Sequence, residues 1–90
     1  MARLIKANGQ TMDVEPKNGT DFLYDELQGF VDGYIETVCL NDTQILVVNE
    51  DGKIHGLPYN NKATELMRSH IKTNDFIVGD ALLCNTSQVK

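Results

Sequence analysis

The sequence contains no long hydrophobic run, and this absence excludes a membrane-spanning protein. Its longest apolar segments, residues 45–48 and 81–84, are four residues each, whereas a transmembrane helix needs about 20 apolar residues. The N-terminus also lacks an apolar stretch of the length found in signal peptides. We therefore expect a soluble, cytoplasmic protein without a membrane partner.

Cysteine is scarce as well. Cys39 and Cys84 lie far apart in the chain, without a CxxC pair and without histidines at metal-ligand spacing. Both fall in segments that we expect to be strands, where cysteine acts as a small buried hydrophobic residue. A reducing cytoplasm disfavours a disulfide, and the spacing offers no set of zinc ligands. We predict no disulfide, no metal site and no cofactor.

Positive charge is the third shortage. The chain has 8 Lys and Arg against 13 Asp and Glu, a formal net charge of −5. Duplex nucleic acid is bound through a basic stripe that neutralises several phosphates, so we expect no duplex nucleic acid as a partner. The excess acid lies in residues 1–45, whereas residues 46–90 are balanced. The second half can supply the one or two cations that a small phosphorylated ligand needs.

Length and pattern predict a single α+β domain over residues 1–90. We expect strands at 3–7, 11–15, 33–40, 44–49, 53–56 and 76–85, a helix at 20–30, and a second helix capped by Asn60 or Asn61. The order ββαβββαβ describes a small mixed or antiparallel sheet with two helices packed on one face. Residues 86–90 are expected to be a loose C-terminal tail. A domain of this size has a small hydrophobic core and often gains stability when an apolar face packs against a second copy. We therefore also expect a homo-oligomer.

Enzyme motifs are missing from the sequence. There is no GxSxG, no HExxH and no glycine-rich phosphate loop. Cys39 and His55 could be considered as a nucleophile and its base, but both fall in or beside expected strands of ordinary alternation. Glu50 and Asp51 could be considered as a general acid and base, but they stand in a tight turn, where neighbouring side chains usually point apart into solvent. We therefore predict a protein that is not an enzyme.

The most unusual segment is 47–64, which predicts a hairpin leading through Gly56-Leu57-Pro58 into the start of a helix. A helix start has unpaired N–H groups and a partial positive charge, so it can hold an anion. Tyr59 adds a ring on which a base can stack. The candidate ligand-binding residues are Asn49, Lys53, His55, Gly56, Tyr59, Asn60, Lys62, Thr64 and Arg68.

Local structure offers a second explanation for the same residue types. Asn60 is a good helix cap, Pro58 fixes the entry into the helix, and Tyr59 packs against the sheet. Asn49 in the same way serves as a turn residue. The sequence leaves both explanations open.

Four blocks of the sequence resemble a known family. They are GYIE at 33–36, VVNEDGK at 47–53, GLPYNNKAT at 56–64 and IVGDALL at 77–83. Together they resemble the domain-of-unknown-function family DUF3846, small proteins carried mainly by bacteriophages and mobile elements. The resemblance covers roughly residues 27–83. It implies a phage context, and it carries over no catalytic or binding residue.

Two functional hypotheses follow. The first is a phage-encoded sponge, an oligomer that sequesters a nucleotide-like immune signalling molecule of the host, with Lys53, Lys62 and Arg68 near its phosphates. The second is an acidic protein-binding inhibitor of a host defence protein or of a nucleic-acid-binding protein. The inhibitor would act through acids of the first half, namely Asp21, Asp25, Glu26, Asp32 and Glu36.

Overall fold

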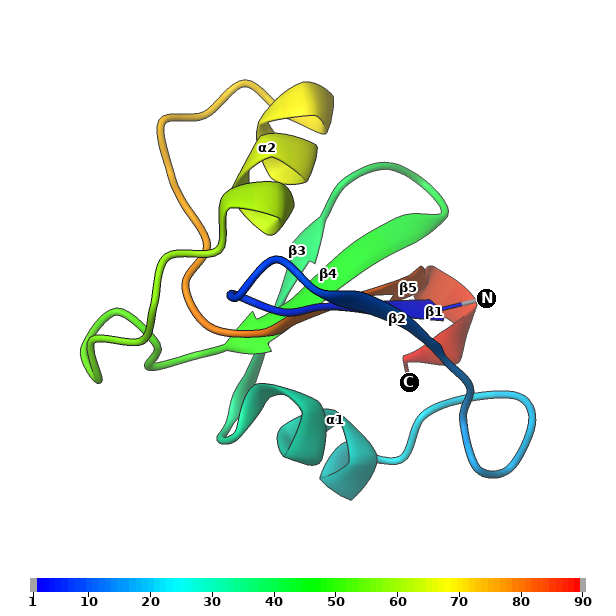
Figure 1. Cartoon of the computed structure of the whole chain (residues 1–90). Helices are drawn as coiled ribbons and strands as arrows, with labels where there is room; N and C mark the ends of the chain where they lie inside the picture. The colour runs from blue at the N-terminus through cyan, green and yellow to red at the C-terminus, as the bar shows by residue number, and fades with distance from the viewer. Residues whose placement is uncertain (1, 90) are drawn as a thin grey trace.

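The computed structural model describes residues 2–89 and forms an antiparallel five-stranded sheet with a helix on either side (Figure 1). The elements are β1 (Ala2–Ile5), β2 (Thr11–Val14), α1 (Tyr24–Val31), β3 (Ile35–Cys39), β4 (Gln44–Asn49), α2 (Asn61–His70), β5 (Ala81–Asn85) and the 3₁₀ helix η1 (Thr86–Gln88). The strands lie in the order β2-β1-β5-β4-β3, and all neighbours are antiparallel. The predicted α+β architecture, an antiparallel sheet with two helices, is confirmed.

The two helices cover opposite faces of the sheet, which corrects the expectation that they share one face (Figure 1). In β4, Ile45 and Val47 belong to the core cluster on the α1 side. Leu46 and Val48 belong to the cluster on the α2 side, with Met67 of α2. A strand buried on both faces has a continuous apolar run instead of an alternating one, and this is the pattern at residues 45–48.

The predicted strand at 53–56 is wrong, because these residues form turns. The His55 N–H donates to the Asp51 carbonyl at 2.9 Å, and the Gly56 N–H donates to the Lys53 carbonyl at 3.2 Å. These groups are satisfied within the turn and pair with no neighbouring strand. The last strand is also shorter than predicted, since only an isolated bridge between Val78 and Tyr59 precedes β5.

The expected loose tail is also corrected for residues 86–88, which form η1. Gln88 is buried, and its carbonyl accepts a hydrogen bond from the Phe22 N–H at 2.8 Å. Its side chain accepts a second one from the Asn85 N–H at 3.0 Å. These bonds attach the C-terminal end to the α1 side of the core. The prediction for Lys90 lies outside the described residues.

No helix within residues 2–89 is both long enough and apolar enough to cross a membrane.

Candidate functional site

Asn60 joins three parts of the fold through its side chain. Its Oδ1 accepts from the Ala63 N–H at 3.0 Å and so caps α2. Its Nδ2 donates to the carbonyls of Ile5, at 2.9 Å, and Gly79, at 2.8 Å. The residue is completely buried. Both donors and the acceptor are therefore used inside the fold, and the capping explanation from the sequence is confirmed.

Asn49 and Thr64 are buried in the same way. Asn49 Nδ2 donates to the Val31 and Asp32 carbonyls at 3.1 and 3.2 Å, and its Oδ1 accepts from the Asp51 N–H at 2.8 Å. The Thr64 hydroxyl accepts from the Ile77 N–H at 2.8 Å. Asn49 thus fixes the end of α1 against β4, and Thr64 fixes α2 against the segment before β5.

Lys62, His55 and Gly56 do not gather around one point in the structure. Lys62 Nζ donates to the carbonyl of Gly9, in the β1–β2 hairpin, at 2.6 Å. His55 and Gly56 are exposed in the turn at 51–56. Gly56 has φ of 67°, a left-handed conformation that glycine adopts without steric cost. The geometry of this turn accounts for Gly56 without a ligand.

Three predicted residues, Lys53, Tyr59 and Arg68, do converge. They meet at residues 75–76, which the sequence did not predict as part of a site. The Tyr59 and Phe76 rings stack with centroids 5.8 Å apart. Lys53 Nζ lies 4.3 Å from the Phe76 ring centroid and forms an ion pair with Asp75. Arg68 Nε donates to the Asp75 carbonyl at 3.0 Å. The adjacent Asp75 and Phe76, an acid followed by an aromatic residue at the start of the predicted strand 76–85, are the sequence signal that could have indicated this cluster.

The carboxylate of Asp75 is held by two donors. Lys53 donates from its ammonium group, and the Phe76 N–H donates at 2.8 Å. These hydrogen bonds, the one from Lys53 first, keep the pKa of Asp75 below its ordinary value. Because both side chains of the ion pair are about half exposed, the pair contributes less than about 1 kcal/mol to stability.

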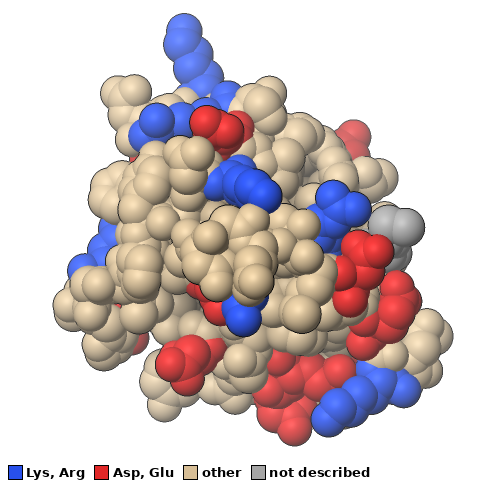
Figure 2. All heavy atoms as spheres, in the orientation of Figure 1, with Lys and Arg blue, Asp and Glu red and all other residues tan. Residues whose placement is uncertain are grey.

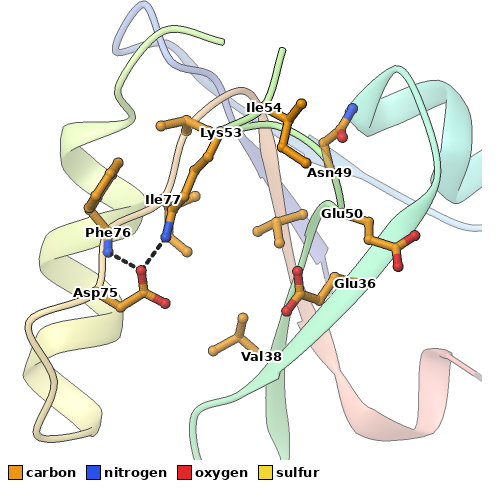
Figure 3. A pocket seen from close by; sticks show the side chains of 11 residues that line it. Glu36, Val38, Asn49, Glu50, Lys53, Ile54, Asp75, Phe76 and Ile77 are labelled. Carbon is orange, nitrogen blue, oxygen red and sulfur yellow. Dashed lines mark hydrogen bonds and ion pairs between the residues drawn. The ribbon is translucent and has the colours of Figure 1, made fainter. Parts of the chain in front are cut away.

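A groove of about 120 Å³ lies beside this cluster, between the β3–β4 edge and residues 75–78 (Figure 3). Val38, Val48, Ile77 and Val78 give it an apolar lining. Sites for drug-sized ligands measure roughly 300–1,000 Å³. The groove in one chain therefore has room for a single side chain and too little for a whole nucleotide.

Carboxylates dominate the charge around the groove. Glu36, Glu50 and Asp75 line it together with a single cation, Lys53, so the lining carries three negative charges and one positive charge. Figure 3 shows Glu36 pointing into the groove, Glu50 turned away from it, and Lys53 engaged by Asp75. Within residues 2–89, Glu36 forms no ion pair. The groove thus favours a cation over an anion.

Apolar side chains are exposed next to these carboxylates. Ile54, at the tip of the turn, is 84% exposed, and Phe76 is 38% exposed. Both line the groove. These two side chains give the rim of the groove an apolar surface for contact with another molecule.

The acids named for the inhibitor hypothesis do not form one continuous surface. Asp21, Asp25, Glu26 and Asp32 lie in or next to α1. Figure 2 shows acidic side chains gathered at the lower and right-hand edge of the molecule, with a basic side chain beside them at the lower right and other basic side chains spread over the rest of this face. Glu36 is instead paired with Val48, on the face of the sheet that α2 covers. Glu26 is also engaged, since it accepts from the Leu23 and Lys17 N–H groups.

The two cysteines differ in environment. Cys84 is buried, and desolvation raises the pKa of its thiol to about 11. Cys39 is exposed at the end of β3, which corrects the expectation that both are buried.

A wider depression of about 360 Å³ lies near Cys84, where the one charged side chain among the described lining residues is Arg3. Arg3 is already paired with Asp13 at 3.4 Å. In residues 2–89, no three His, Cys, Asp or Glu side chains come together to hold a metal.

The fold and the groove define a small α+β domain, with a five-stranded antiparallel sheet between two helices and a shallow, acidic, partly apolar groove at one sheet edge. The chain belongs to the family described as Domain of unknown function (DUF3846), whose family model matches residues 1–89. The match thus extends beyond both ends of the four blocks seen in the sequence. Searches of curated proteins and of solved structures found no match.

Proposed function

We propose that this chain is a non-enzymatic binding protein that recognises a basic segment of a partner protein through the groove beside β3. The observation that carries the proposal is the Glu36 carboxylate, which points into a partly apolar groove and has no ion-pair partner among the described residues. Such a groove suits a side chain with an apolar stem and a cationic head. Arginine and lysine have this chemistry.

The dimensions and surroundings of the groove support one such side chain. The stem of an arginine packs against Val38 and Ile77, and its guanidinium reaches Glu36, where it can form two parallel hydrogen bonds. Ile54 and Phe76 add apolar contact at the rim. Burying about 100 Å² of apolar surface stabilises a complex by roughly 2.5 kcal/mol before the cost of association. A single site of this kind binds weakly, and neighbouring contacts must add to it.

The partner that best fits this chemistry is a basic protein of the host cell. Proteins that bind nucleic acid carry exposed Lys and Arg segments, and a groove with net negative charge in a chain of charge −5 attracts them. In this proposal the chain is phage-encoded, acts in the host cytoplasm and inhibits a host defence protein or a nucleic-acid-binding protein. The family match supports the phage context only through the resemblance given above.

The proposal is tested by titrating the isotope-labelled protein with a defined peptide and recording amide chemical shifts by NMR. The probe is the acetylated, amidated pentapeptide Thr-Val-Arg-Val-Thr, and its control has glutamate in place of arginine. We expect shifts at Glu36, Val38, Ile54 and Ile77 with the arginine peptide alone.

The matched variants each remove one negative charge. Glu36→Gln should weaken binding about fivefold, which corresponds to about 1 kcal/mol for one partly exposed ion pair. Asp25→Asn, on α1 at the other face of the sheet, should leave the affinity unchanged. The proposal is refuted if the glutamate peptide binds as well as the arginine peptide, or if neither peptide binds.

A second candidate function is sequestration of a nucleotide-like signalling molecule by a homo-oligomer. The observation in its favour is the Tyr59–Phe76 stack bordered by Lys53 and Arg68, because a base can stack on an exposed ring while cations hold its phosphates. The groove is too small for a whole nucleotide and lined mainly by carboxylates. A second copy of the chain would therefore have to complete the site.

Native mass spectrometry with cyclic dinucleotides and ADP-ribose tests this second candidate. Sequestration predicts a discrete oligomer that retains the intact ligand and loses it in Lys53→Ala and Arg68→Ala. A chain that ignores the whole panel would contradict sequestration and agree with the basic-peptide proposal.

A further inference from the structure

Strand β3 is an edge strand with unpaired backbone groups. Within residues 2–89, its single neighbouring strand is β4. The Glu50 N–H donates to the Tyr34 carbonyl at 2.8 Å, and the Leu40 N–H donates to the Gln44 carbonyl at 3.0 Å. In an antiparallel pair, residues alternate between facing the partner strand and facing away. The N–H and C=O groups of Ile35, Thr37 and Cys39 therefore point to the open side of the sheet.

This edge has few of the features that usually prevent a further strand from pairing. Natural edges are protected by proline, by charged side chains, by bulges or by short length. The sequence of β3, IETVC, has neither proline nor lysine, and its one charged residue is Glu36. The strand pairs with β4 in continuous register over five residues. The opposite edge strand, β2, has four residues and is followed closely by Pro16. Of the two edges, β3 is the one suited to accept another strand.

The open edge and the groove belong to the same surface. Glu36 and Val38 extend from β3 on the α2 side of the sheet and line the groove. Side chains of an added strand alternate between the two faces. Every second side chain of that strand would therefore stand next to Glu36 and Val38, at the mouth of the groove.

We infer that an extended, basic segment of the partner protein adds to the free edge of β3 as a further strand and inserts one Lys or Arg side chain into the groove beside Glu36. This inference rests on the proposed function and specifies how the partner is held. Backbone hydrogen bonds supply affinity and the groove supplies specificity, as in other cases of strand addition.

Charge favours such a partner over a second copy of this chain. Antiparallel pairing of two copies around Thr37 would place the Glu36 residues of both diagonally across from each other on one face. It would also join two chains that each carry a formal charge of −5. A segment with a cation opposite Glu36 meets neither obstacle.

The strand addition can be tested by blocking the edge without breaking the sheet. The Thr37 N–H points away from β4, so Thr37→Pro removes an outward donor and no bond to β4; proline is found in edge strands at such positions. Thr37→Ser keeps the N–H and is the matched control. With the arginine pentapeptide, we expect Thr37→Pro to weaken binding at least tenfold and Thr37→Ser less than twofold.

A second arm changes the probe and leaves the protein intact. Peptides with N-methyl groups on one set of alternating amides cannot donate to β3, whereas N-methylation of the other set leaves the paired edge free. One methylated peptide should lose binding and the other should keep it. Equal binding of both peptides would overturn the inference, whatever Thr37→Pro does to folding.

The outcomes separate this inference from the proposed function. Suppose that Thr37→Pro binds the arginine peptide normally, that the unaltered protein binds both methylated peptides normally, and that Glu36→Gln still weakens binding. The basic-segment proposal then stands and strand addition is refuted. If no arginine peptide binds the unaltered protein, both fail. If the unaltered protein dimerises in sedimentation and Thr37→Pro is monomeric, a second copy occupies the edge and the inference is overturned.

Discussion

Replacement of Asn60 by alanine should cost about 3 kcal/mol of the free energy of unfolding. The change removes the α2 cap, worth roughly 0.5–2 kcal/mol, and the two hydrogen bonds to the carbonyls of Ile5 and Gly79. Buried polar groups that lose a partner cost about 1–3 kcal/mol. A domain of this size has a stability of roughly 5–15 kcal/mol, so the loss is a large fraction of the whole.

Urea denaturation followed by circular dichroism measures this change, and two further variants divide it. Asn60→Ser keeps a capping oxygen but loses the amide group that donates to the Ile5 and Gly79 carbonyls, so it should recover only the capping part of the loss. Asn61→Ala, at the exposed first residue of α2, should alter stability by less than about 0.5 kcal/mol. A loss below about 1 kcal/mol for Asn60→Ala, or full stability for Asn60→Ser, would refute the three-way role of this side chain.

Three further predictions concern other parts of the fold. Gly33→Ala should destabilise by about 1–3 kcal/mol in urea denaturation, because an added Cβ would lie 2.6 Å from Asn49 Nδ2; a neutral effect would contradict the packing of Asn49. A thiol reagent at pH 8 should label Cys39 and spare Cys84, whose pKa is raised to about 11, so mass spectrometry should show one adduct, and none after Cys39→Ser. The pKa of Asp75 is lowered on folding, so its ionised form stabilises the fold above its ordinary pKa of about 3.8. This contribution is lost as the pH falls through the lowered value. In Lys53→Met, the acid-dependent change in the free energy of unfolding should therefore be smaller, by less than about 1 kcal/mol.

Much of the fold follows from local sequence signals. The apolar run of β4 predicts a buried strand, and the structure has it at the predicted bounds, Gln44–Asn49. Asn8-Gly9 predicts the first hairpin, where Gly9 has φ of 96°. Asn60 was one of two predicted caps of α2, and it forms that cap. Each of these features is decided by residues close together in the chain.

The errors in the predicted fold have physical causes. The unbroken run in β4 already indicated burial on both faces, yet the helices were expected on one. The 53–56 segment has the turn residue Gly52 before it and Gly56 at its end, and its hydrogen bonds close locally. Residues 86–88 look polar and loose in the sequence, but Gln88 is buried through hydrogen bonds to Phe22 and Asn85.

The candidate site was harder to predict, because its contacts join distant residues. Lys53 meets Asp75 across a separation of 22 residues, and nothing in the spacing of either residue indicates that contact. The exposure of Glu36 beside a free edge depends on β3 being last in the strand order, which the sequence does not determine. Asn49 and Thr64 were predicted to bind a ligand because of their polar side chains. In the structure, these side chains form hydrogen bonds that hold parts of the fold together.

We propose that the groove beside β3 recognises a cation on an extended segment of a partner protein. The most direct test of this proposal is the NMR titration with the Thr-Val-Arg-Val-Thr peptide, comparing the unaltered protein with Glu36→Gln and Asp25→Asn. We expect shifts confined to the groove and the β3 edge, with affinity reduced about fivefold in Glu36→Gln and unchanged in Asp25→Asn. Equal affinity of all three proteins, or equal binding of the glutamate peptide, would contradict it.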